Sequence, residues 1–278
     1  MAGDIDDGRS SSTTDEGGRS PSSPEYLTAT SGLPEVREVD LAAPLRWLRL
    51  GWSDLRRAKG ASLFYGVALA VMGFVLVRGA GSGAIGLALI TGFLIVGPFM
   101  LMGLYDISRR FERSDTVDLP RSFAAWRANI PAIGFVALLL ALLLAVWIRI
   151  SVVVVALFFP SGAPEPGQLW AELIASPDGI AFIGAYAAAG LGFALFVFAT
   201  SVVSLPMLLD RPKMDALSAM ITSFNALRAS FAPMLLWAVL VVTLTGVGFA
   251  VYCFGLIVIL PWIGHATWHA YRDTVAAP

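Results

Sequence analysis

The chain has 278 residues, of which 57% are hydrophobic and only 14% are charged. Soluble domains carry about 25% charged residues, so this composition is typical of a membrane protein. The formal net charge of −1 and the lack of a basic patch with stacking aromatics argue against nucleic-acid binding. The single cysteine, Cys253, excludes an internal disulfide and a cysteine-based metal cluster.

Residues 1–40 differ in composition from the rest of the chain. They are rich in Ser, Thr, Gly and Asp and carry few large apolar side chains, so they cannot bury enough surface to offset the entropy lost on folding. We expect a disordered cytoplasmic tail over 1–40 and a transmembrane domain over 41–275. Since no apolar h-region follows the start, we expect no cleaved signal peptide, and the first membrane helix would direct insertion.

The apolar runs after residue 60 are long enough to cross a bilayer as helices, which takes about 20 residues. Residues 233–270 lack Asp, Glu, Lys and Arg and would extend about 57 Å as a single helix, so we expect a turn in "TLTGVGF" (243–249). The third run can continue past Arg149 through "SVVVVALFF". The sequence therefore predicts an all-α, polytopic membrane protein with six spans: 61–77, 84–105, 131–148, 179–205 and a pair within 233–270.

The Lys and Arg residues are distributed unevenly between the predicted loops. Within residues 41–275, fourteen lie before the first span, between the second and third, between the fourth and fifth, or after the sixth, whereas the other side has only Arg78 and Arg149. Because cytoplasmic loops carry an excess of Lys and Arg, both termini are expected in the cytoplasm of a bacterial inner membrane.

Three segments that precede spans carry apolar residues three and four positions apart: 41–55, 119–130 and 217–231. This spacing predicts amphipathic helices that lie on the anionic inner leaflet. "WSDLR" (52–56), "FAAWR" (123–127) and "FNALR" (224–228) also share an aromatic residue and a following arginine, as a threefold hairpin repeat would, although any amphipathic stem before a span looks similar. The expected interfacial anchors are Trp52, Arg56, Phe123, Arg127, Phe224, Arg228, Trp268 and Arg272.

The ends of two predicted spans resemble each other. "PFMLMGLYDISRR" (98–110) and "PWIGHATWHAYRD" (261–273) both carry a proline, aromatics and an arginine, and His269 aligns with Asp106. His265 and His269 lie four residues apart, so both face one side of a helix and can share a metal ion if further ligands exist. The alternatives are interface anchoring or a helix–helix hydrogen bond. His265, His269 and Asp106 are the candidate functional polar residues, and we expect no metal and no cofactor.

Motifs of catalysis are absent from the sequence. There is no G-x-S-x-G, no phosphate-binding glycine loop and no H-E-x-x-H, so we expect that the protein is not an enzyme and has no catalytic residues. Asp210 and Asp215 flank "RPKM" in a predicted loop and are expected to be solvated.

Three stretches resemble a bacterial family of predicted integral membrane proteins that is catalogued as a domain of unknown function: "GLYDISRRFE", "SLPMLLDRPKMDALSAMITSFNALRASFAPMLLWA" and "PWIGHATWHAYRD". The resemblance covers roughly residues 41–275 and implies a polytopic inner-membrane protein of a Gram-negative bacterium. Some members carry the label "putative cytochrome c oxidase subunit". A catalytic haem–copper subunit needs about six histidine ligands on several helices, which two histidines on one helix do not supply.

The sequence favours a non-enzymatic inner-membrane protein with a membrane-structural or partner-binding role. Membrane-buried ionisable residues, which mark coupled transporters, are nearly missing. One alternative is a permease for a small uncharged or amphipathic solute, and another is an accessory protein of a respiratory complex. The expected partners are the lipid bilayer with its anionic inner leaflet, and a membrane protein or a second copy of the chain.

Overall fold

The computed structural model describes residues 32–79, 100–159, 173–174 and 177–277. The chain divides into two units, Met1–Leu33 and Pro34–Pro278, and every helix below belongs to the second. Most of the predicted tail and residues 84–99 of the predicted second span therefore lie outside the described residues.

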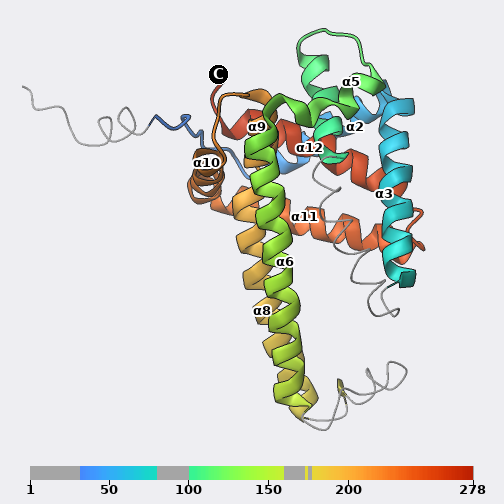
Figure 1. Ribbon diagram of the computed structural model, residues 1–278, viewed down its shortest axis with the longest axis vertical. Coiled ribbons are helices and arrows are strands. Elements are labelled where there is room, and N and C mark those ends of the chain that lie inside the picture. Colours follow the sequence, from blue (N-terminus) through green and yellow to red (C-terminus); the bar gives the residue numbers. More distant parts are fainter. Residues whose placement is uncertain (1–31, 80–99, 160–172, 175–176, 278) are drawn as a thin grey trace, which may run out of the picture. The chain divides into compact units, whose positions relative to one another are not determined.

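The described residues form helices almost throughout, which confirms the all-α prediction (Figure 1). Their single β contact is an isolated bridge between Val36 and Val275. Residues 100–112 are helical, and so are α2 (Ala43–Arg57), α3 (Lys59–Gly79), α5 (Leu119–Phe123), the 3-10 helix η1 (Ala125–Asn129), α6 (Ile130–Phe158), α8 (Pro177–Ser201), α9 (Ser204–Asp210), α10 (Ala216–Ala229), α11 (Phe231–Ala250) and α12 (Leu256–Thr274).

Four described helical stretches are long and apolar enough to cross a membrane: Lys59–Leu76, Ala125–Phe158, Pro177–Asp210 and Phe231–Ala250. They contain the predicted first, third, fourth and fifth spans. The third continues through Arg149 as one helix to Phe158, as the apolar run after that arginine suggested. The polytopic membrane architecture is thus confirmed.

The predicted turn needs correction. Residues 243–249 lie inside α11, and the chain reverses at 251–255, where Tyr252 and Cys253 have positive φ values of 51° and 65°. Gly248 allows this return, because a Cβ there would come within 2.5 Å of the Leu256 side chain. The helix that follows, α12, is not among the four candidate spans, since its second half carries polar and charged side chains.

The helix α12 packs most extensively on α2 and α3. Glycines permit the close approach: a Cβ on Gly51 would lie 2.6 Å from the backbone nitrogen of Ala266, and one on Gly66 would lie 1.9 Å from the carbonyl oxygen of Ile257. Large side chains fill the remaining core around α2, α9, α11 and α12. Those that are almost fully buried include Trp47, Met207, Leu208, Trp237, Trp268 and Tyr271.

The predicted amphipathic repeat is only partly regular. The first and third segments form the continuous helices α2 and α10, but the middle one is a short helix followed by a 3-10 turn, α5 and η1. In the first segment the predicted apolar stripe is divided, because Leu48 and Leu55 of α2 are buried whereas Leu41, just before α2, and Leu45 and Trp52 within it are exposed. One face of α2 packs on α12, so the outward stripe is narrower than the sequence suggested.

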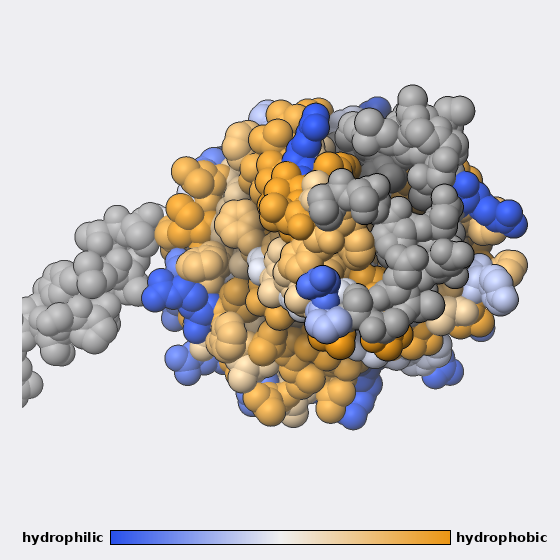
Figure 2. All heavy atoms as spheres, turned by 90° about the horizontal axis from the view of Figure 1, so that it is seen from below, coloured by the Kyte–Doolittle hydropathy of each residue, from blue (hydrophilic) through white to orange (hydrophobic). Residues whose placement is uncertain are grey.

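The helices α6 and α8 pack against each other along an aromatic seam. Trp147 stacks on Phe193 with ring centroids 5.4 Å apart, and the Tyr186 hydroxyl donates to Ser151 Oγ at 3.1 Å. No side chain in the most apolar stretch of either helix is buried, compared with a third of those in α3. Hydrophobic side chains cover most of the described surface seen from below, and hydrophilic ones lie mainly at its edge (Figure 2).

Candidate functional site

His265 lies in a fully buried polar cluster between three helices. Its Nε2 is 2.8 Å from Ser62 Oγ on α3, and its Nδ1 is 2.8 Å from Ser108 Oγ in the helical residues 100–112. Ser62, Ser108 and His265 are each 0% exposed. Of the alternatives that the sequence left open for this histidine, the geometry selects helix–helix hydrogen bonding.

Asp54 joins both histidines through one carboxylate oxygen. Its Oδ2 accepts from Ser108 Oγ at 2.7 Å and lies 2.8 Å from His269 Nε2. Asp54 faces inward because it follows Trp47 and Gly51 at helical spacing on the face of α2 that packs on α12. The buried carboxylate is therefore hydrogen-bonded from α12 and from a third helix.

These contacts also fix the tautomer of His265. Ser108 has one hydroxyl proton, and it donates that proton to Asp54. Its oxygen must then accept from Nδ1–H of His265, which leaves Nε2 to accept from the Ser62 hydroxyl. The resulting order of donors runs from Ser62 through His265 and Ser108 to Asp54.

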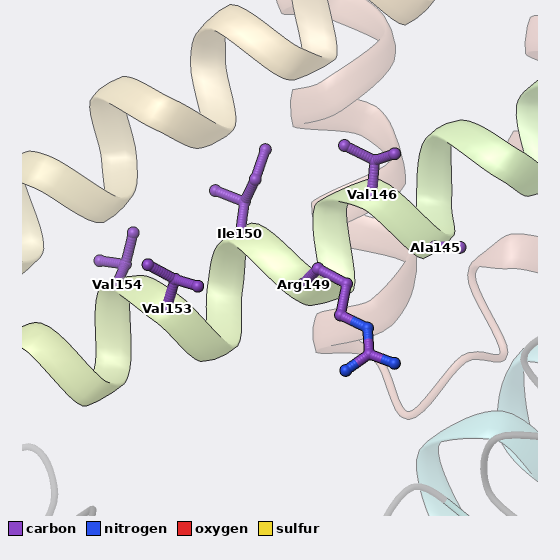
Figure 3. A pocket seen from close by; sticks show the side chains of 6 residues that line it. All are labelled: Ala145, Val146, Arg149, Ile150, Val153 and Val154. Carbon is purple, nitrogen blue, oxygen red and sulfur yellow. The ribbon is translucent and has the colours of Figure 1, made fainter.

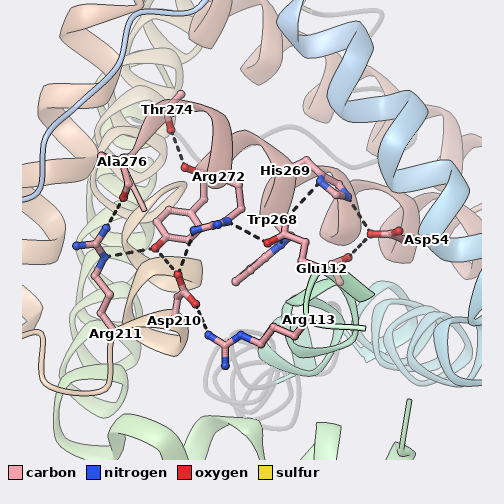
Figure 4. Close-up of polar contacts among 12 residues, drawn as sticks. Asp54, Glu112, Arg113, Asp210, Arg211, Trp268, His269, Arg272, Thr274 and Ala276 are labelled. Atoms are coloured by element: carbon pink, nitrogen blue, oxygen red, sulfur yellow. Dashed lines mark hydrogen bonds and ion pairs between the residues drawn. The ribbon is translucent and has the colours of Figure 1, made fainter. Parts of the chain in front are cut away.

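A second carboxylate, Glu112, extends the network toward the end of α12 (Figure 4). It accepts from Trp268 Nε1 at 3.0 Å and from Arg272 Nε at 3.0 Å. His269 Nδ1 lies 4.0 Å from the same carboxylate. Trp268, His269 and Arg272, on successive turns of α12, thus contact carboxylates on other helices.

Asp210, at the end of α9, is the third carboxylate of this network after Asp54 and Glu112. Its burial corrects the expectation that it is solvated. It is 8% exposed and accepts from Tyr271 at 2.9 Å and from Arg113 at 3.1 Å. Arg272 Nη1 lies 3.5 Å away. Asp215, by contrast, is exposed and caps α10 by accepting from the backbone of Ser218.

Asp106 is buried but stands apart from the histidines. Arg109 and Arg110 donate to its two oxygens at 2.5 and 2.6 Å, so its partners lie on its own helix. The structure therefore brings His265 and His269 into one network and leaves Asp106 in a separate ion-pair cluster. The sequence alignment of His269 with Asp106 does not correspond to a shared site.

Burial determines the charge state of the network. It lowers the pKa of His265 to about 4, with Asp54 opposing the shift, so the imidazole is neutral at pH 7. Burial likewise raises the pKa of Tyr271 to about 12, which keeps its hydroxyl protonated and able to donate to Asp210.

The composition of this cluster resembles that of a hydrolase triad, but its geometry does not. In a triad the carboxylate orients the histidine directly, whereas Asp54 reaches the ring of His265 only through Ser108. Both ring nitrogens are already hydrogen-bonded, so a metal ion would have to displace a serine. Among the described residues, no three His, Cys, Asp or Glu side chains are placed to hold a metal.

The predicted anchors fall into three groups. Arg56, Arg127 and Arg228 are exposed, and Trp52 and Phe224 are largely exposed. Phe123 is half-buried and stacks on Tyr65 at 5.1 Å. Trp268 is fully buried instead of interfacial, because its indole is held by Glu112, and Arg272 pairs with the same carboxylate.

Sequence reasoning missed most partners of the histidines. Ser62, Ser108 and Glu112 carry no local motif, and their contacts to α12 span more than 150 positions. The signal that was available is the spacing of Asp54 from Trp47 and Gly51, which places a carboxylate on the same side of α2 as a large aromatic residue.

Comparison with known proteins gives a family match for part of the chain. Residues 86–210 match the model of a family described as "Predicted integral membrane protein (DUF2189)", which confirms the resemblance found in the sequence. No curated protein and no solved structure matches the chain. The matched part contains Ser108, Glu112 and Asp210, whereas α2 and α12 lie outside it.

Proposed function

We propose that this integral membrane protein is a non-enzymatic, structural component of the bacterial inner membrane, braced on the anionic cytoplasmic leaflet, with both termini in the cytoplasm. One observation carries the proposal. The helix α2 is fixed on α12 by one face, and its outward side exposes Arg49 and Arg56, with Trp52 between them at spacings of three and four residues; the Trp52 ring also packs on Trp262 of α12, with centroids 5.3 Å apart. Aromatic and basic residues on one exposed face are typical of a helix at an anionic membrane surface.

The helix α10 presents a comparable stripe. Leu217, Ile221 and Phe224 are exposed along one side, and Arg228 follows them one turn later. Its other side is anchored by the buried Ala219, Ala226 and Leu227. Because α2 and α10 both expose apolar and basic residues, we expect both helices to lie on the same leaflet.

The burial of the polar cluster supports a role without catalysis. Ser62 and His265 are both 0% exposed, so a substrate would have to open the contacts of α12 with α2 and α3 to reach them. The network is better suited to holding those helices in register than to chemistry.

The test is thermal unfolding of the purified protein in nanodiscs of zwitterionic lipid and of lipid with about one-third phosphatidylglycerol. The wild type is expected to have a higher Tm in the anionic discs, since each basic residue near such a surface contributes about 1 kcal/mol. Arg49→Glu with Arg56→Glu should abolish the difference, and Arg49→Lys with Arg56→Lys should keep it. Equal Tm values of the wild type in both discs would refute the bracing role.

A further inference from the structure

Arg149 is a cation on the apolar surface of α6. It is exposed, and no hydrogen bond or ion pair reaches it from the described residues. It borders an open hollow of about 430 Å³ whose other lining residues are all aliphatic, among them Val146, Ile150 and Val153 (Figure 3). Its guanidinium points away from the ribbon of α6. An arginine on an apolar helix is costly in a membrane unless it reaches the interface or pairs with a group of opposite charge.

The exposed face around Arg149 has the pattern of a helix-packing seam. One line of exposed residues on α6 has spacings of four, three, four, three, four, three and four positions: Pro131, Phe135, Leu138, Leu142, Ala145, Arg149, Val152 and Ala156. Other exposed residues, such as Val146 and Ile150, lie beside it. A seven-residue alternation of this kind is what a second helix needs to pack along α6, and a polar residue at one seam position fixes the register of such a pair. Arg149 occupies that position.

The length of α6 argues for a protein neighbour over a lipid headgroup. Its 29 residues span about 44 Å, against about 30 Å of hydrocarbon. If Arg149 lies at the phosphates, the exposed Val152, Val153 and Leu157 stand outside the hydrocarbon. If these residues lie in the hydrocarbon, Arg149 is about 13 Å from the end of the helix and its side chain is too short to reach the phosphates. Either placement requires protein contact.

A second copy of the chain does not satisfy this seam. Copies inserted with one orientation would pair α6 with α6 in parallel, so Arg149 would face Arg149 at the same level. Like charges opposed in this way are destabilising. We infer that α6 binds a transmembrane helix of another protein through this seam, and that an Asp or Glu of that helix pairs with Arg149. This inference does not depend on the bracing of α2 by lipid.

The experiment is photocrosslinking in native membranes. A photoreactive phenylalanine is placed at Leu142 or Val152 on the seam, and at Val242, an exposed residue of α11, as the control. The seam positions are expected to give one cross-linked membrane protein that the control does not. Mapping should place the cross-link within a turn of an Asp or Glu in an apolar helix. Arg149→Glu should lower the cross-linking yield about tenfold or more, whereas Arg149→Lys should retain the yield. When the partner's acidic residue is replaced by Arg in combination with Arg149→Glu, the yield should be restored.

Unchanged Tm and membrane levels of the Arg149→Glu variant will separate lost docking from lost folding. Several outcomes would overturn the inference: cross-links only to phospholipid, to a second copy, or to residues 80–99 of the same chain. A cross-link to another protein that is insensitive to both Arg149→Glu and the charge exchange would overturn it as well. None of these results bears on the Tm difference between anionic and zwitterionic discs.

Discussion

The hydroxyl of Ser108 bridges from His265 to Asp54, with distances of 2.8 Å to the ring and 2.7 Å to the carboxylate. A single proton therefore determines the direction of every hydrogen bond in the cluster. Because Ser108 donates to the carboxylate, the imidazole must donate to Ser108.

This relationship predicts the neutral Nδ1–H tautomer for His265 at pH 7. In free histidine the Nε2–H form predominates, so ¹⁵N chemical shifts of labelled protein distinguish the two. Ser108→Ala removes the acceptor and should shift His265 toward Nε2–H, with Ser62 then accepting the bond. Ser122→Ala, which alters a buried serine that bonds Tyr65 instead, should leave the tautomer unchanged. An Nε2–H tautomer in the wild type would contradict the assigned direction.

Acid should destabilise the protein through His265. Its pKa is about 4 in the folded state and 6.5 without burial, so the unfolded chain binds the proton first as the pH falls. The contribution of neutral His265 to the free energy of unfolding is therefore fully present above about pH 6.5 and is lost progressively as the pH falls to about 4. Tm measured across this window should fall for the wild type.

The matched variant for this test is His265→Asn, which keeps hydrogen-bonding groups but does not titrate. It is expected to have a lower Tm at pH 7 and a smaller decline between pH 6.5 and 4. Parallel declines in both proteins would show that other groups control the acid response.

Removal of the Asp54 carboxylate should destabilise the fold strongly. Asp54→Ala leaves Ser108 and His269 without their shared acceptor in a buried site, and breaking a buried pair costs about 3 kcal/mol. Asp54→Asn keeps the shape and one acceptor, and should cost less. The measurement is denaturant unfolding in detergent micelles. The control is Asp40→Ala, which breaks an exposed ion pair with Arg46 and should have little effect on the free energy of unfolding. If Asp40→Ala and Asp54→Ala lowered that free energy equally, the structural importance of the cluster would be disproved.

Glycine substitutions in α3 should separate close packing from helix propensity. Gly66→Ala places a methyl group against the backbone of Ile257, and such overpacking costs about 2 kcal/mol. Gly60→Ala on the same helix meets no atom within 4 Å and should be neutral or stabilising, since alanine is the better helix former. Only Gly66→Ala should lower the Tm; a neutral Gly66→Ala would mean that α12 is not held this close to α3.

Two fully buried tryptophans should respond differently to phenylalanine. Trp268 donates to Glu112, whereas Nε1 of Trp237 is buried without an acceptor in the described part of the chain. Both substitutions remove a similar volume, but only Trp268→Phe removes a hydrogen bond to a charged group, worth about 2 kcal/mol. Trp268→Phe should therefore unfold at lower denaturant, and a larger loss for Trp237→Phe would imply a partner for that indole.

The apolar runs predicted α3, α6, α8 and α11 because composition alone determines whether a helix can cross a bilayer. The turn before α12 was misplaced because Thr243, Thr245 and Gly246 are tolerated inside an apolar helix, whereas the actual reversal depends on the positive φ values of Tyr252 and Cys253. Nothing in the local sequence of these two residues indicates that conformation.

The candidate site was predictable only in part. The two histidines stood out by their spacing, and their use in helix–helix hydrogen bonds was one of the alternatives. Asp210 looked like a loop charge because its partners Arg113 and Tyr271 are 97 and 61 positions away. Pairings at such separation depend on how helices pack, which a single sequence does not reveal.

The contacts that complete α2 come from the opposite end of the chain. Trp47 Nε1 donates to Asp273 across 226 positions, and the backbone of Arg37 donates to Thr274. During synthesis on the ribosome, the inward face of α2 emerges long before α12 exists to cover it. That face carries Asp54 and Trp47 and stays uncovered by α12 until the end of the chain has been made, which leaves a defined window in which a chaperone or the insertion machinery could shield it.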